Sequence, residues 1–233
     1  MSNLIQFDQH LMLKLNGSDS IYGDAVMKIF SSTWVWIPLA LTAVIILFKN
    51  NTLRNFILVA LMLGLTIFLC DRISSGLIKP WVGRLRPCQD PTILDQIDIV
   101  NNSRSGKYGF ISSHAANTFG VFMFITLLVR HKLLGLSLFI WASIDSYSRI
   151  YLGVHYPGDI FCGAVFGMLV ATIVYLVYIF LHKRLDFSPG KITNFYTRTG
   201  YLVEDLDLVN LMLYITYAFI LLFAFVYVYI IFY

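Results

Sequence analysis

Six long apolar runs, separated by polar connections, dominate this chain. A helix that spans a bilayer needs about 20 mostly apolar residues, and the third and fourth runs reach this length only by extending into their flanks. The chain is therefore predicted to have an all-α fold, a polytopic membrane helix bundle with about six transmembrane helices. The runs are Ile29–Phe48, Leu53–Cys70, Ala115–Val129, Leu133–Tyr147, Pro157–Leu181 and Leu208–Tyr233.

The composition agrees with a membrane protein. Hydrophobic residues make up 58% of the 233 positions and charged residues only 13%, whereas soluble domains carry about 25% charged residues. We expect one integral membrane domain over residues 1–233, with the lipid bilayer as its surroundings. Nucleic acid is not an expected partner, because no basic run alternates with aromatic residues in a polar segment.

Ahead of the apolar runs, Leu4, Phe7, Leu11 and Leu15 recur at helical spacing among polar residues. This pattern predicts an N-terminal amphipathic helix that lies on a membrane face. An ordinary packed terminal helix is an equal alternative on the pattern alone.

The segment Ser148–Asp159 places charged residues between two apolar runs, where charge is expensive. His155 precedes Asp159 by four residues, so the carboxylate can orient the imidazole. Arg149 adds a planar fork of N–H donors that suits an oxyanion such as phosphate. A charged set at this depth indicates chemistry.

With six spans, the connectivity brings three polar segments to one membrane face. Each residue has a structural alternative: Lys79 and Arg86 can anchor at lipid head groups, and Ser112 and Ser113 are ordinary helix N-cap residues. Together the segments supply three cations, two histidines, one carboxylate and two small hydroxyls. The segments are Lys79–Pro87, Ile111–His114 and Ser148–Asp159.

Two mechanisms can use this set. The first takes His114, His155 and Asp159 as a two-histidine, one-carboxylate metal site, which nearby cations would oppose by charge repulsion. In the second, the cations bind a phosphate, one histidine attacks phosphorus, and the other protonates the leaving oxygen. The second mechanism gives every charged residue a task, so we favour it and expect no metal and no cofactor.

The three segments resemble the signature of the type 2 phosphatidic acid phosphatase superfamily. Its first motif, a lysine, six residues and Arg-Pro, matches Lys79 to Arg86 and Pro87. Its third motif, Ser-Arg, five residues, a histidine, three residues and an aspartate, matches Ser148 to Asp159 in full. Its second motif is usually Pro-Ser-Gly-His, whereas this chain has Ile111–His114 with serine in place of glycine.

The resemblance implies a role for each matched residue. His155 would be the nucleophile that forms a phosphohistidine, Asp159 would orient it, and His114 would be the general acid. No metal would be required. Vanadium haloperoxidases share this cradle but are mostly soluble, so the apolar runs favour a phosphatase. The implied phosphate-binding residues are Lys79, Arg86, Ser112, Ser113 and Arg149.

The expected substrate is an amphiphile with an exposed phosphate, because the site lies at a membrane face. We favour a lipid A phosphate or undecaprenyl diphosphate of a bacterial envelope. Phosphatidylglycerol phosphate and phosphatidic acid are alternatives, as is a non-catalytic binder of anionic lipid. Arg84, Arg104 and Lys107 are interpreted as solvated surface charges, with contacts to the lipid head group as the alternative.

Orientation follows from basic residues, which favour the cytoplasmic side. The side with the tight turns Lys49–Thr52 and Arg130–Lys132 has eight basic residues and the other side nine. If Lys79, Arg86 and Arg149 are reserved for chemistry, the second side keeps six. We therefore expect a multi-pass protein of the bacterial inner membrane whose active site faces the periplasm or the outside.

Overall fold

The computed structural model describes residues 2–100, 103, 106–184 and 196–232. No β-strand occurs among these residues, which confirms the predicted all-α class. Short 3₁₀ turns cover Thr33–Trp36, Pro87–Gln89 and Leu94–Gln96, and one π-helical turn covers Ser74–Ile78. The α-helices are α1 Ser2–Leu15, α2 Ile21–Phe30, α3 Ile37–Lys49, α4 Leu53–Ile73, α5 Lys79–Val82, α6 Ser113–Val129, α7 Lys132–Tyr151, α8 Pro157–Arg184 and α9 Val203–Phe232.

The number of membrane spans differs from the prediction. Three helical stretches in the described part are long and apolar enough to cross a bilayer: Leu53–Val82, Pro157–Arg184 and Val203–Ile231. A fourth is reached if α2 and the stretch Thr33–Lys49, which meet at 62°, count as one broken span. α6 is apolar but has only 17 residues, and α7 carries Asp145 and Arg149. The count of six spans is therefore not confirmed.

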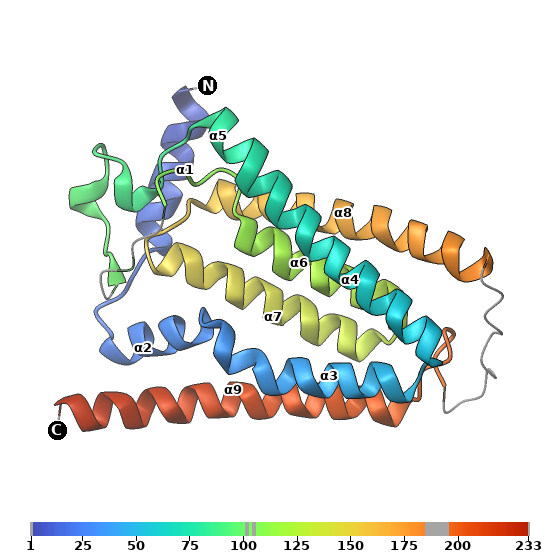
Figure 1. Cartoon of the computed structure of the whole chain (residues 1–233). Helices are drawn as coiled ribbons and strands as arrows, with labels where there is room; N and C mark the ends of the chain where they lie inside the picture. The colour runs from blue at the N-terminus through green and yellow to red at the C-terminus, as the bar shows by residue number, and fades with distance from the viewer. Residues whose placement is uncertain (1, 101–102, 104–105, 185–195, 233) are drawn as a thin grey trace.

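α6 lies at the centre of the bundle and contacts α4, α7 and α8, while α9 runs along α2 and α3 (Figure 1). The closest approach is between α6 and α8. A Cβ atom added to Gly163 would lie 2.5 Å from the carbonyl oxygen of Ser112, and one on Gly167 would lie 2.8 Å from the carbonyl carbon of Ala116. Small residues let membrane helices meet backbone to backbone, and here they hold the first turn of α8 beside the start of α6.

α1 has the amphipathic character that its sequence predicts. Met12 is fully buried and packs with Ile150 and Tyr156. On its outer side Leu4 is 74% exposed and Phe7 65% exposed. A helix with exposed apolar side chains beside a membrane bundle suits the interface between lipid and water.

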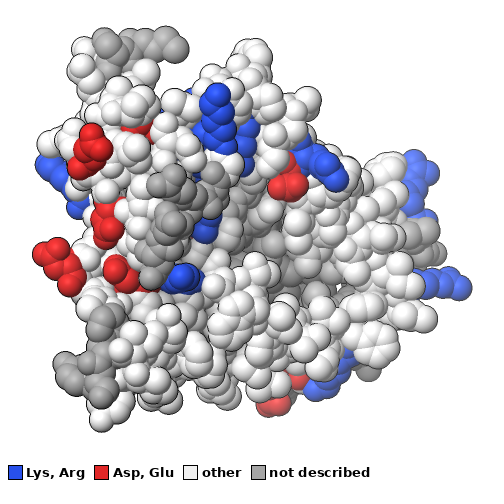
Figure 2. All heavy atoms as spheres, turned by 60° about the vertical axis from the view of Figure 1, so that its left-hand side comes forward, with Lys and Arg blue, Asp and Glu red and all other residues white. Residues whose placement is uncertain are grey.

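The three motif segments gather at one end of the bundle, as the connectivity predicts. α5, the start of α6 and the start of α8 lie at this end with α1, and the α3–α4 and α6–α7 turns lie at the opposite end (Figure 1). Figure 2 shows acidic and basic side chains close together on the face that carries α1. The predicted site residues therefore lie together at this polar end of the bundle.

Candidate active site

Lys79 lies near the end of the continuous helical stretch formed by α4, the π turn and α5. Gly83 ends this stretch in the left-handed conformation, with φ of 64° and its N–H donated to the carbonyl of Lys79. Glycine takes that conformation without the steric penalty of a Cβ atom. The chain can therefore reverse directly after Lys79 and bring Arg86 back beside it.

Arg86 is only 7% exposed, and the backbone holds its guanidinium in place. Its Nε donates to the carbonyl of Tyr108 at 3.1 Å, and its Nη1 donates to the carbonyl of Val154 at 3.1 Å. The main-chain N–H of Arg86 also binds the carbonyl of Lys107 at 3.2 Å. The first motif is thereby fastened to the turn that carries His155.

That turn follows the last residues of α7. The N–H groups of Val154 and His155 donate to the carbonyl of Arg149 at 3.1 and 3.2 Å. Gly153 has φ of 80°, and a Cβ atom there would lie 2.8 Å from the carbonyl oxygen of Asp98. Glycine at this position lets the chain turn sharply and point His155 into the protein.

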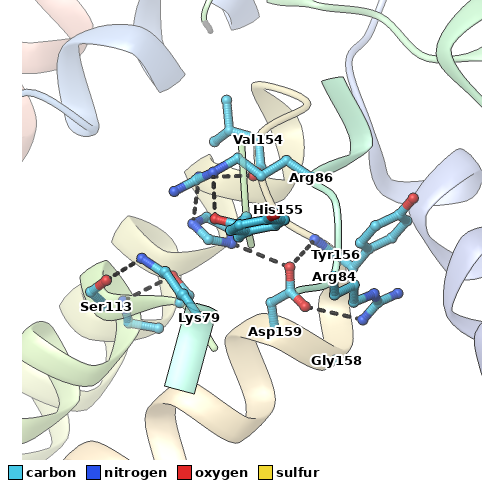
Figure 3. Close-up of polar contacts among 12 residues, drawn as sticks. Lys79, Arg84, Arg86, Ser113, Val154, His155, Tyr156, Gly158 and Asp159 are labelled. Atoms are coloured by element: carbon cyan, nitrogen blue, oxygen red, sulfur yellow. Dashed lines mark hydrogen bonds and ion pairs between the residues drawn. The ribbon is translucent and has the colours of Figure 1, made fainter. Parts of the chain in front are cut away.

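His155 is 2% exposed and lies between Arg86 and Asp159 (Figure 3). Arg86 Nη1 is 2.8 Å from its Nε2, and Asp159 Oδ2 is 3.3 Å from its Nδ1. Because a guanidinium only donates, Nε2 carries a lone pair and Nδ1 carries the proton. Burial, followed by the charges of Arg86, Arg149 and Lys79, holds the pKa of His155 well below its usual range. The imidazole is therefore neutral, which is the form that the predicted role of His155 requires.

The second motif forms the start of α6. Ser112 is the N-cap residue, and its hydroxyl accepts the N–H of Ala115 at 3.3 Å. Its own N–H donates to the carbonyl of Asp159 at 3.0 Å, which joins the second motif to the third. The Ser113 hydroxyl accepts a hydrogen bond from Lys79 Nζ and lies 2.9 Å from Ser75 Oγ. Ser113, where the family usually has glycine, thus holds one of the predicted phosphate-binding cations.

Positive charge exceeds negative charge around His155. Asp159 is fully buried, and its Oδ1 accepts a hydrogen bond from Arg84 Nη1 at 3.0 Å. Lys79, Arg86 and Arg149 all act electrostatically on His155. Arg149 Nη1 donates to Ser31 Oγ at 2.5 Å, and its buried Nε has no hydrogen-bond partner among the described residues. Surplus cations with an unpaired donor make a site for an anion.

Arg84 and Asp8 are two site residues that the sequence did not reveal. Besides its bond to Asp159, Arg84 lies 2.7 Å from Asp8 Oδ2 and stacks over the ring of Tyr156 at 3.9 Å. Asp8 Oδ1 also accepts the N–H of Gly158 at 2.8 Å. The interpretation of Arg84 as a solvated charge is therefore wrong, because it joins α1 to the orienting carboxylate. Lys107 is exposed, as predicted, and Arg104 lies outside the described residues.

The described residues do not support the metal alternative. Asp159 pairs with His155, whereas the carboxylate beside His114 is Asp145, with Oδ2 2.7 Å from Nε2. Nowhere in the described ranges do three or more His, Cys, Asp or Glu side chains gather closely enough to hold a metal ion. The charged side chains around His155 are compatible with the predicted phosphate site.

Comparison with known proteins agrees with this geometry. A family model described as the PAP2 superfamily matches residues 55–183. The chain belongs to the PAP2 superfamily. It is 36% identical to the lipid A 4'-phosphatase of Bacteroides thetaiotaomicron over 81% of this chain and 85% of that protein. It is 30% identical to the lipid A 4'-phosphatase of Porphyromonas gingivalis over 79% of this chain and 78% of that protein.

A solved structure supports the same fold. The transmembrane PAP2-type phosphatidylglycerolphosphate phosphatase from Bacillus subtilis covers 80% of this chain and 89% of its own, with a TM-score of 0.58 and 19% identity. Together with the family match, these relatives identify the protein as a membrane enzyme that hydrolyses phosphate esters of lipids. The family predicted from the three motifs is confirmed.

Proposed function

We propose that this PAP2 enzyme releases inorganic phosphate from a lipid A-type phosphate monoester through a phosphohistidine on His155, without a metal or other cofactor. The observation that carries the proposal is the neutral His155, paired with Asp159 and surrounded by three cations whose charge a phosphate would balance. The proposed nucleophile His155 thus lies beside both the carboxylate that orients it and the cations that would bind the phosphate.

The reaction has two steps. In the first, Nε2 of His155 attacks phosphorus, the bond between phosphorus and the lipid oxygen breaks, and His114 gives a proton to that oxygen. In the second, a water molecule gives a proton to His114 while its oxygen attacks phosphorus, which releases phosphate and restores His155. Asp159 keeps the Nδ1–H tautomer throughout, so that Nε2 always faces phosphorus.

The cations bind the phosphoryl group and stabilise the charge on its oxygens in the transition state. As the substrate binds, Arg86 moves its hydrogen bond from Nε2 of His155 to a phosphoryl oxygen. Lys79, held by Ser113, and Arg149, through its unpaired Nε, bind further oxygens. Ser112 acts through the backbone, by capping the helix whose first N–H groups face the site.

Two observations support a lipid A-type substrate. The two relatives that are 36% and 30% identical to this chain are both named lipid A 4'-phosphatase. An apolar groove of about 520 Å³ also lies beside Arg84, between α1 and the first turns of α8, and includes Phe7, Phe110 and Phe161 in its lining. Such a groove suits an acyl chain whose phosphate lies at the adjacent polar end of the bundle.

We also propose that residues 1–233 act as one domain and that the polar end faces the periplasm from the inner membrane. The support is the basic residues of the α3–α4 and α6–α7 turns, which lie at the opposite end. A reporter fused at the Arg130–Lys132 turn should stay cytoplasmic, and an outward-facing reporter would overturn the orientation.

The decisive experiment is a phosphate-release panel with the purified full chain in detergent and chelator. Lipid A phosphate, undecaprenyl diphosphate, phosphatidylglycerol phosphate and phosphatidic acid are compared by kcat/KM, and we expect lipid A phosphate to be hydrolysed best. His155→Ala should lose turnover while its Tm stays near that of the wild type, and vanadate should compete with substrate.

Other outcomes would favour other functions. Activity that disappears in chelator and returns with a divalent metal would refute the metal-free mechanism. Binding of a lipid phosphate without turnover would point to a binder, and peroxide-dependent halide oxidation with vanadate would point to a haloperoxidase. Full activity of His155→Ala would end the proposed role of that residue.

A further inference from the structure

Asp145 is a buried carboxylate that the two-step mechanism does not use. It lies on α7, inside the apolar run Leu133–Tyr147, and is 2% exposed. A carboxylate buried in a membrane bundle is costly unless it is paired, and such groups usually have a functional partner. Asp145 is therefore expected to have a partner with a functional role.

The partner is His114, the proposed general acid. Asp145 Oδ2 lies 2.7 Å from His114 Nε2. His114 Nε2 has no partner that meets hydrogen-bond geometry, so this contact is a close approach of a ring nitrogen to a carboxylate oxygen and not a well-aligned hydrogen bond. Catalytic hydrogen bonds often align only in the Michaelis complex or the transition state, and the His114 side chain, which is 31% exposed, is not fully enclosed by its neighbours.

Charge balance with Arg149 is the simpler explanation for Asp145, because Arg149 lies one turn further along α7. The two side chains form no ion pair in the described structure, and Arg149 Nη1 donates to Ser31 Oγ. His114 is thus the side chain with which Asp145 pairs directly.

We propose that Asp145 positions His114, so that the site contains two histidine–carboxylate pairs with opposite tasks. This inference rests on the proposed phosphohistidine mechanism. Asp159 binds Nδ1 of His155 and leaves Nε2 to attack phosphorus. Asp145 lies 2.7 Å from Nε2 of His114, which leaves Nδ1 as the nitrogen that gives the proton in this proposal. Each carboxylate selects the ring nitrogen that reacts.

The first step needs one proton transfer, from His114 to the leaving oxygen. As the bond between phosphorus and the lipid oxygen breaks, the proton on His114 Nδ1 moves to that oxygen. Asp145 stays ionised and retains its contact with Nε2–H, so His114 changes from imidazolium to neutral imidazole. Water returns a proton to Nδ1 in the second step. The pair therefore matters most for an alcohol leaving group, which departs poorly without a proton.

The experiment compares two substrates with the purified full chain. One is a lipid phosphate monoester of an alcohol, and the other is a nitrophenyl phosphate bearing a long alkyl chain, whose leaving group departs without a proton. We expect Asp145→Asn to lower kcat at least ~10-fold on the first and less than about twofold on the second. His114→Gln should show the same selectivity, and the double variant should lose no more than His114→Gln.

Ser146→Ala is the matched control. Ser146 is buried next to Asp145 on α7, and its Oγ lies 3.4 Å from Thr118 Oγ1 of α6. Its replacement therefore loosens the α6–α7 contact but leaves the 2.7 Å contact between the side chains of Asp145 and His114 in place. We expect the ratio of the two activities to stay at its wild-type value in Ser146→Ala.

Equal losses on both substrates in Asp145→Asn would overturn the proposal, and so would no loss on either. If Asp145→Asn does not purify as folded protein, Asp145→Glu replaces it, because the longer carboxylate misplaces the ring and should give the same selective loss. If the wild type releases no phosphate from either substrate, it is the proposed function that fails, so the two failures can be told apart.

Discussion

Gly167→Ala tests whether the α6–α8 contact sets the catalytic geometry. A Cβ atom at this position would lie 2.8 Å from the carbonyl carbon of Ala116 and 2.9 Å from its Cα, and closer still to its carbonyl oxygen. These neighbours are backbone atoms of α6 and cannot rotate away. The two helices would have to separate by about 1 Å to restore ordinary van der Waals contacts.

Such a separation should affect both activity and stability. The start of α6 carries His114 and Ser113, whereas the start of α8 carries Asp159, so the two halves of the site would move apart. A misplacement of about 1 Å can lower the rate on the order of 100-fold. Overpacking of this kind typically costs about 1–3 kcal/mol of stability, so Tm should fall by several degrees.

The assay is kcat for phosphate release in detergent, together with Tm of the same preparation. Gly64→Ala on α4 is the control, because a Cβ atom there meets nothing within 4 Å and alanine favours a helix over glycine by about 1 kcal/mol. Its activity should match that of the wild type, with Tm unchanged or slightly higher. A Gly167→Ala enzyme with wild-type kcat and Tm would refute the reasoning.

Three further predictions concern single side chains. Arg84→Ala should lower kcat by roughly tenfold or more because it leaves Asp159 without its cation, whereas Lys107→Ala, which removes an exposed cation of the same loop, should have no effect; equal activities would show that Arg84 is dispensable. Folded His155 resists protonation, so below pH 6.5, the ordinary pKa of histidine, the unfolded chain binds more protons and stability falls as pH falls, by roughly 1 kcal/mol per pH unit. His155→Gln should remove that part of the decline in Tm between pH 6.5 and 5, and an unchanged slope would mean that folded His155 titrates normally. Lys79→Met should weaken competitive inhibition by vanadate, and an unchanged inhibition constant would exclude Lys79 from the phosphate clamp.

Much of the site was readable from the sequence because its motifs are local. Asp159 lies in the first turn of α8 and His155 lies two residues before that helix begins, so a separation of four residues is enough to bring the two side chains together. Arg86 returns to Lys79 because Gly83 reverses the chain within a few residues. Apolar runs predicted which segments are helical, and the connectivity predicted which ends of those helices meet.

The residues that the sequence did not reveal act across large separations along the chain. Nothing near Arg84 in the sequence indicates that it pairs with Asp8 and Asp159, because those contacts depend on how α1 docks. Asp145 lies within an apolar run, and the only signal was a carboxylate where charge is costly. The count of six spans is not confirmed, because α6 has only 17 residues and α7 carries Asp145 and Arg149 within its length.

The bond from Arg86 to Nε2 of His155 has a consequence for chemical selectivity. In the proposed mechanism, the lone pair that attacks phosphorus is the one already engaged by a guanidinium at 2.8 Å. A neutral electrophile, such as a carboxylic ester in the surrounding lipid, has no anionic oxygen that could replace Nε2 of His155 as the acceptor for Arg86. A phosphate does, because its oxygens are stronger acceptors for a guanidinium than an imidazole nitrogen. On the proposed mechanism, the negative charge of the substrate would thus release the nucleophile that attacks it, and the abundant acyl esters of the bilayer would leave the nucleophile engaged.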